Sequence, residues 1–250
     1  MDRKRPSLLV ACLPIACMLA AAADAQPTMS AKAAIPQARE LSWLDLDRAE
    51  ARTRYGHPNE MWRYRALRAL KLEQPEQALK DFRFAARYGD KFSQHALSLM
   101  YWHGVGTTVD RAQAYAWSDL AAERGYRDLL LLREKMWMEM NAAQRAQALL
   151  LGEALYSKYG DAVARPRMEW ELRKALARAT GSRVGFEKDR ILFSQHGVTG
   201  DAGLSAREFY AEKRWNPKAY WREQDRQWNR RVIVSPPQQL PDPPARETVP

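Results

Sequence analysis

A set of three alanines and one glycine occurs twice in this chain, and every member of the second copy lies 36 residues after its counterpart. The two copies are Ala78, Ala85, Ala86 and Gly89, and Ala114, Ala121, Ala122 and Gly125. Paired alanines let two helices approach closely, and a glycine three residues later supplies the left-handed conformation that ends a helix. Gly160 continues the glycine series after another 35 residues. The repeat predicts a helix pair of about 36 residues, a length typical of stacked helical-hairpin solenoids.

Residues 59–180 carry an almost purely helical pattern. Ala, Leu, Arg, Glu and Gln dominate, and apolar residues recur at spacings of three and four. The chain holds only 12 Gly in 250 residues, which argues against an all-β fold with glycine-rich turns. We therefore expect an all-α fold: a short helical-hairpin solenoid, or α/α superhelix, with an irregular C-terminal extension.

The stretch from residue 93 to residue 125 is the most specific in the chain. Its characteristic residues are Gln94, Leu97, Met100, Tyr101, Gly104, Gly106, Asp110, Ala114, Trp117, Ala121, Ala122 and Gly125. This pattern resembles the Sel-one-like repeat, a subclass of the tetratricopeptide-like helical repeats. Mild departures stand at Ser93, Ser98, Thr107 and Gln113. The resemblance covers one full repeat and the second half of the preceding one, and it implies a scaffold or adaptor without catalysis.

The resemblance also implies a place for a partner. In relatives of this fold, the first helix of the repeat lines the inner, concave surface, and its non-consensus positions contact a bound peptide. On this chain those positions are Phe92, His95, Leu99, Trp102 and His103. Such an aromatic and imidazole-bearing face suits a protein or peptide partner that docks as a helix or an extended chain. The alternative is that some of these side chains pack against the neighbouring unit.

The first 25 residues have the form of a secretory signal peptide. Three cations within residues 2–5 precede an uncharged stretch at residues 6–23, and an A-x-A cleavage motif ends at Ala25. We expect cleavage after Ala25 and export, to a bacterial periplasm. An uncleaved anchor and lipidation at Cys12 or Cys17 are the alternatives. Both cysteines of the chain lie in this segment, so the mature protein is expected to form no disulfide.

The segments around the repeats have different expected roles. Residues 26–58, which contain three prolines, are predicted to be a linker with a short helix from Ser42 to Arg52, because Ser42 and Asp45 fit a capping box. The Sel-one-like repeat domain is predicted to span residues 59–180.

Within that domain, residues 127–159 are predicted to form a helix pair that is either a degenerate third unit or a cap, with a capping box at Asn141. A last helix from Arg167 to Ala179 is expected to cover the end. Residues 181–234 are predicted to be an extension with short helices, and strand-like runs in 181–204 are compatible with a hairpin. Residues 235–250 are rich in Pro and are expected to be a disordered tail.

The net charge of +10 favours anionic partners. From Phe209 to Arg231, cations interleave with aromatic residues, a pattern suited to phosphate-bearing surfaces. We define this predicted basic-aromatic surface by Lys213, Arg214, Trp215, Lys218, Trp221, Arg222 and Trp228. It supports an alternative function, binding of anionic envelope components such as lipid headgroups or cell-wall polymer. Export argues against nucleic acid. The competing interpretation is a helix whose Trp side chains pack on the solenoid end while its cations face water.

The sequence shows no enzyme signature. It contains no G-x-S-x-G, H-E-x-x-H or P-loop motif. On one helix His95 and His103 would lie roughly 12 Å apart, too far to share a metal ion. We expect no catalytic residue, no metal and no cofactor, and a hydrolase remains the third option.

Overall fold

The computed structural model describes residues 30, 34–35, 40–181, 186–187, 190–195 and 198–229. The predicted signal peptide at 1–25, most of the predicted linker before residue 40 and the Pro-rich tail at 235–250 lie outside the described residues.

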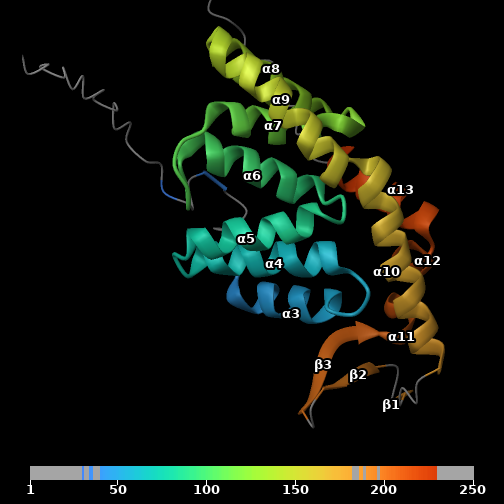
Figure 1. Cartoon of the computed structure of the whole chain (residues 1–250). Coiled ribbons are helices and arrows are strands. Elements are labelled where there is room, and N and C mark those ends of the chain that lie inside the picture. The colour runs from blue at the N-terminus through green and yellow to red at the C-terminus, as the bar shows by residue number, and fades with distance from the viewer. Residues whose placement is uncertain are drawn as a thin grey trace, which may run out of the picture.

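The helical body is built from consecutive helices that are layered one against the next (Figure 1). Its first five described helices are α3 (Trp43–Thr53), α4 (Pro58–Lys71), α5 (Pro75–Ala86), α6 (Lys91–His103) and α7 (Arg111–Ala121). A short 3-10 turn, η1 (Ala122–Arg124), follows α7, and both α8 (Arg127–Glu139) and α9 (Ala142–Tyr159) pack against α7. The described elements from residue 43 to residue 181 are all helical, which confirms the predicted all-α class for this part of the chain.

Local sequence signals explain where these helices begin. Ser42 and Asn141 each form a capping box, as predicted. Asp90 and Asp110 accept a backbone hydrogen bond at the starts of α6 and α7. Pro75 occupies the first turn of α5, where a missing N–H costs nothing.

The repeated alanines and glycines act at the helix ends as predicted. Both alanine pairs, 85–86 and 121–122, are buried. Gly89 and Gly125 have φ angles of 74° and 73°, which is the left-handed conformation that glycine adopts without strain. The prediction that Gly160 continues this series is wrong, because its φ of −62° and ψ of 156° are extended. A counterpart lies upstream instead, at Gly56 after α3, with a φ of 80°.

The prediction of a linker over residues 26–58 is wrong for residues 40–58 and for Ile35. The short helix forms as expected, but it packs against α4 as part of the body. Leu46 and Ile35 belong to the main buried core, and His57 is buried as well. The scattered charges of this segment suggested a linker. In the structure, α3 exposes most of these charges to solvent and buries Leu46.

The predicted last helix also differs from the structure. α10 (Asp161–Gly181) begins earlier than Arg167 and does not add another layer over the end. Instead it crosses the ends of α3, α5 and α7 (Figure 1). The Tyr55 hydroxyl donates to the carbonyl of Ala175 at 2.8 Å, and the Arg167 guanidinium donates to the carbonyl of Arg87.

The C-terminal extension packs on α10. Its strands pair antiparallel in chain order and are β1 (Phe186–Glu187), β2 (Arg190–Gln195) and β3 (Val198–Ser205). They extend the predicted hairpin by a third strand. They lead to α11 (Ala206–Phe209), α12 (Glu212–Trp215) and α13 (Pro217–Asn229). A second buried cluster joins these helices to α10, and it consists of Met168, Leu172, Ala175, Phe209, Trp215, Tyr220 and Trp221.

None of the helices in the described part of the chain is both long and apolar enough to cross a bilayer.

Gly125→Ala should destabilise the protein by about 1–2 kcal/mol, because a residue with a Cβ is strained in the left-handed conformation. No atom lies within 4 Å of the position that a Cβ would take, so the loss would report backbone conformation alone. Urea unfolding measures the change.

Gly152→Ala is the matched control for this prediction. Gly152 lies inside α9, and its Cβ position is equally open. The change should stabilise the helix by about 0.5–1 kcal/mol. Shifts of the same sign in both variants would contradict the assignment of Gly125 as a helix-ending residue.

Candidate functional site

The face of α6 that the resemblance assigns to a partner is largely enclosed by the protein itself. Phe92 is buried, and Trp102 is only 9% exposed. The Phe92 ring lies 6.2 Å from the Phe82 ring and 5.7 Å from the Arg63 guanidinium. The Arg111 guanidinium lies 3.9 Å from the centroid of Trp102. The prediction that Phe92 and Trp102 line a groove is therefore wrong, because both rings belong to the core between neighbouring helices.

His95, Leu99 and His103 are half-buried on the same helix. The His95 ring meets the Trp228 indole edge-on, with 6.5 Å between the centroids. Trp228 belongs to α13 and also stacks on Tyr126, at 5.4 Å and an interplanar angle of 10°. The last turn of α13 therefore occupies the part of the predicted groove around His95.

The residues of the predicted basic-aromatic surface lie on different sides of their helices. Trp215 and Trp221 are buried, and Trp228 is half-buried. The exposed cations are Lys213, Lys218 and Arg222, whereas Arg214 is half-buried and donates to the carbonyl of Arg52 at 2.9 Å. The prediction of a joint surface is wrong, because aromatic and cationic side chains point to opposite sides. Trp215 and Trp221 pack inward, as the competing interpretation expected, but against α10 and not on the solenoid end that it named.

The other end of α13 is held by a buried histidine that the sequence did not single out. The His57 ring stacks on Tyr220 at 5.5 Å and lies 5.2 Å from the Trp215 ring. Burial, with a contribution from the Arg214 charge, lowers the pKa of His57 well below its usual value. His57 is therefore neutral at pH 7 and packs as an aromatic core residue.

A group of charged side chains joins α6, η1 and α10, and we call it the Asp161 network. Arg124 binds the Asp161 carboxylate with two hydrogen bonds of 2.7 and 3.0 Å. Arg165 binds the same carboxylate at 2.8 Å. The fully buried ammonium of Lys91 lies 3.2 Å from Asp161 and 2.7 Å from Glu123. One carboxylate thus meets three cations from three elements.

This arrangement fixes the protonation states of its members. Burial alone would raise the pKa of Asp161, but the hydrogen bonds and charge of Arg124, together with Lys91 and Arg165, lower it to about 2. Burial raises the pKa of the neighbouring Tyr126 to about 12, where a hydrogen bond to Asp225 adds to the effect and the Arg124 charge opposes it. Neither group changes its charge near neutral pH. The network is therefore better suited to holding α6, η1 and α10 together than to proton transfer.

A recess of about 640 Å³ opens beside the network. Its walls are formed by Glu123, Arg124, Gly125, Tyr126, Asp161, Arg165, Asp225 and Asn229. The charged groups on these walls are paired with one another or with Lys91, as described above. Within the described residues, no group of three His, Cys, Asp or Glu side chains is placed to hold a metal ion.

The sequence did not reveal this network. Arg124 precedes Gly125, and Asp161 follows Gly160, 37 residues after Arg124. The opposite charges beside these two glycines were the signal that the sequence offered for this pair. For Lys91 the sequence holds no such signal, because its burial depends on η1 and α10 together.

Comparisons of the chain with protein-family models, curated proteins and solved structures found no match. The functional proposals below therefore depend on the sequence and on the geometry of this chain.

Trp102→Ala should lower the free energy of unfolding by about 3–5 kcal/mol, because it leaves a cavity in the core. Trp170→Ala is the matched control, since Trp170 is 52% exposed and its loss should change stability by about 0.5 kcal/mol at most. Chemical unfolding of both variants measures the difference. If the Trp102→Ala protein is as stable as the wild type, Trp102 is a surface residue and not part of the core.

Asp161→Asn should destabilise the protein by about 2–3 kcal/mol at pH 7, because the pKa of Asp161 lies well below its unfolded value. A carboxylate with a lowered pKa contributes stability above its unfolded pKa, and the contribution is lost as the pH falls through the folded pKa. The difference between wild type and variant should therefore shrink as the pH falls from 3.8 to about 2.

The control for this prediction is Glu153→Gln, at an exposed position of α9. It should show no comparable loss at pH 7. A stability difference between wild type and Asp161→Asn that stays constant across the acid range would show that the charge of Asp161 is not the cause.

Proposed function

We propose that the chain is an exported, non-catalytic interaction scaffold built from Sel-one-like, tetratricopeptide-like helix pairs stacked as a solenoid. The pairs α4–α5 and α6–α7 carry the same buried alanines and left-handed glycines and are layered in order, which supports this interpretation. In a stack of repeats each unit covers the apolar side of its neighbour, so the last unit exposes a side that a partner can cover.

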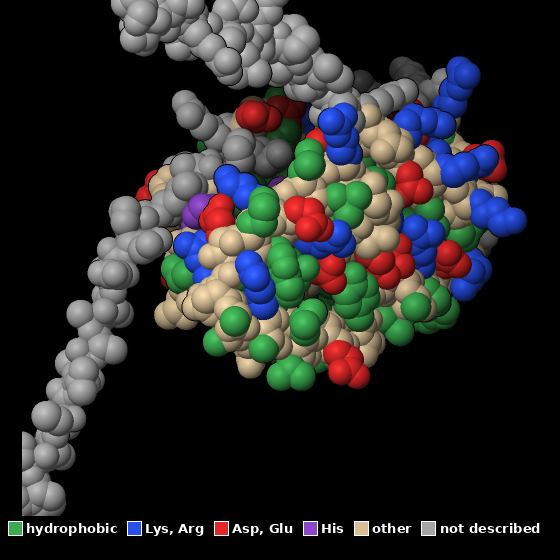
Figure 2. All heavy atoms as spheres, turned by 90° about the horizontal axis from the view of Figure 1, so that it is seen from above, with side chains coloured by type: hydrophobic (Ala, Val, Ile, Leu, Met, Phe, Trp, Pro, Cys, Tyr) green, Lys and Arg blue, Asp and Glu red, His purple; other side chains and the backbone are tan. Residues whose placement is uncertain are grey.

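The observation that carries the proposal lies on α8 and α9. Four large apolar side chains there are more than half exposed, and we call this surface the α8–α9 end: Leu131, Met138, Leu149 and Leu150. Leu131 and Met138 lie two turns apart on one side of α8, and Leu149 and Leu150 are adjacent on α9. Figure 2 looks down on this end and shows hydrophobic side chains at several points of its surface. Exposed apolar surface of this kind marks a site of contact with another protein.

The charges at this end favour a protein partner over a polyanion. Lys135 and Glu139 are both exposed on α8 and lie 4.0 Å apart. Arg133 contacts both Asp119 and Glu134. Figure 2 accordingly shows cations and acids between the hydrophobic side chains. A surface of mixed charge with apolar anchors is typical of protein interfaces.

The test is photocrosslinking with a benzophenone side chain placed at Leu150. In the native envelope it should give one protein adduct of reproducible mass. Met138→Asp should lower the yield by about tenfold or more, because it places a charge in the apolar contact.

Leu72 is the matched control position, since it is 52% exposed at the end of α4 and lies outside the α8–α9 end. The same crosslinker at Leu72 should give no such adduct. An adduct with twice the mass of the chain would identify the partner as a second copy. Equal adducts from both positions, or none from Leu150, would contradict the proposal.

A further inference from the structure

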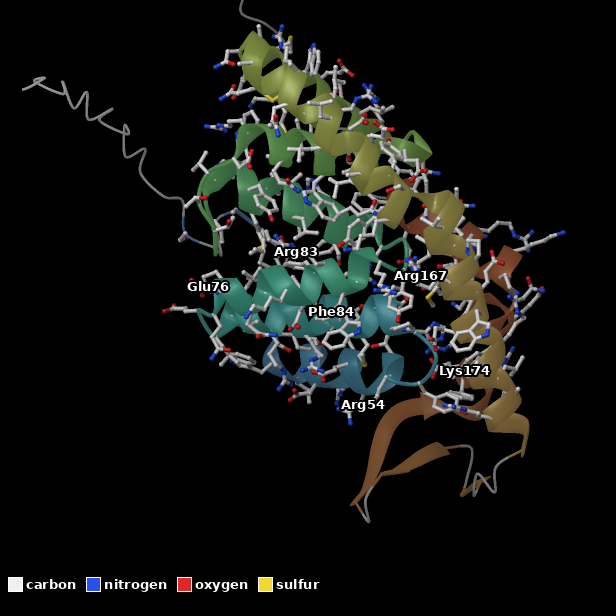
Figure 3. The ribbon with its side chains drawn as sticks, in the orientation of Figure 1. Arg54, Glu76, Arg83, Phe84, Arg167 and Lys174 are labelled. Atoms are coloured by element: carbon white, nitrogen blue, oxygen red, sulfur yellow. The ribbon has the colours of Figure 1, made fainter. Side chains whose placement is uncertain are left out.

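A second exposed surface lies where α5 and α10 meet, and it is strongly basic. Its cations are the exposed Arg65 of α4, Lys80, Arg83 and Arg87 on or just after α5, and the half-buried Arg167 and Lys174 of α10. Figure 3 shows the labelled Arg83, Arg167 and Lys174 on one side of the molecule. The hydrogen bond from Arg167 to the carbonyl of Arg87 connects α10 to the end of α5. We call this surface, together with the aromatic residues described next, the α5–α10 face.

Aromatic rings stand among these cations. Phe84 is 49% exposed and stacks on Trp62, with 4.7 Å between the centroids. The Arg65 guanidinium lies 4.6 Å from the centroid of Trp62. On α10 the exposed Trp170 holds the Lys174 ammonium 4.2 Å from its ring centroid. Cation–π contacts therefore hold both aromatic groups in place at the surface.

Acids offset part of the charge of this face. Glu76 is exposed at the start of α5, one helical turn before Lys80 (Figure 3). Glu171 lies 3.7 Å from Lys174 and offsets part of its charge. Asp81, although it is on α5, is buried and bonded to Gln77. The face therefore differs from the α8–α9 end, where charges of both signs alternate.

We propose that the α5–α10 face binds the surface of an anionic lipid bilayer. Lipid phosphates would pair with the cations, while Trp170 and Phe84 would enter the interfacial layer. Tryptophan is favoured at that depth because its ring is apolar and its N–H is polar. The proposal goes beyond the scaffold function, because it concerns a different face and a different class of partner.

The geometry favours a bilayer over an acidic peptide. The exposed rings of Phe84 and Trp170 are on separate elements, each is bordered by cations, and the recess described above is formed by other residues. A peptide needs grooves that fix its side chains, whereas headgroups can arrange themselves around fixed cations and rings. Each cation near an anionic membrane strengthens binding about fivefold, so three of them contribute about a hundredfold.

The test is co-sedimentation of the purified chain with vesicles of equal parts phosphatidylglycerol and phosphatidylcholine, and with phosphatidylcholine vesicles. The variant Lys80→Glu/Arg87→Glu/Lys174→Glu should bind the anionic vesicles about a hundredfold or more weakly. Trp170→Ala should bind about tenfold more weakly at unchanged charge. Binding of the wild type should fall steeply between about 0.1 M and 1 M salt, because salt screens the headgroup charges.

The control variant is Lys213→Glu/Lys218→Glu/Arg222→Glu, which changes the net charge equally at the exposed cations of the C-terminal helices. It should retain binding within a few-fold, and near-UV circular dichroism should show that each variant is folded. Absence of binding to anionic vesicles would overturn the proposal. So would equal binding to phosphatidylcholine, or an equal loss in the control variant. Binding to soluble polyglutamate but not to vesicles would assign the face to an acidic protein instead.

Discussion

The pairing of Asp161 with Arg124 connects parts of the chain that lie far apart in the sequence. Arg124 ends η1, the turn that follows α7, and Asp161 begins α10. Lys91, at the start of α6, is buried beside them. Since α10 in turn packs against α12 and α13, the position of the whole C-terminal part depends on this contact. Removal of the Asp161 carboxylate would leave the buried Arg124 guanidinium without its main partner, which is a costly change in a protein.

The same packing determines which surfaces remain for recognition. α13 places Trp221 in a buried cluster and Trp228 over His95, so the predicted groove is used for internal contacts. The two exposed surfaces described above differ in their chemistry. The α8–α9 end is apolar with mixed charge, whereas the α5–α10 face is cationic and aromatic. On the two proposals made above, the chain would join a protein partner to an anionic membrane.

The sequence predicted features that depend on a few neighbouring residues. Helix starts at Ser42 and Asn141, and the left-handed turn at Gly125, follow from bonds within one helical turn. It failed where burial is decided by distant segments. The position of Trp102 in the helical pattern is the same whether its ring faces a groove or the core. Likewise, the interleaved Trp and Lys residues have the same spacing whether they share one surface or lie on opposite sides of a helix. The cations of the α5–α10 face escaped notice because they come from separate helices and adjoin only in the fold.

The path of α10 has a consequence for how this protein can evolve. Most repeat arrays gain or lose units freely, because each unit contacts only its neighbours. Here α10 contacts the layered helices at two distant points, through Asp161 beside Arg124 after α7 and through Ala175 beside Tyr55 after α3. Those two points are separated by about 21 Å of helix. An inserted pair would lengthen the stack but not α10, and one of the two contacts would be lost. The distance between these two contacts along α10 therefore matches the number of helices layered between α3 and α7.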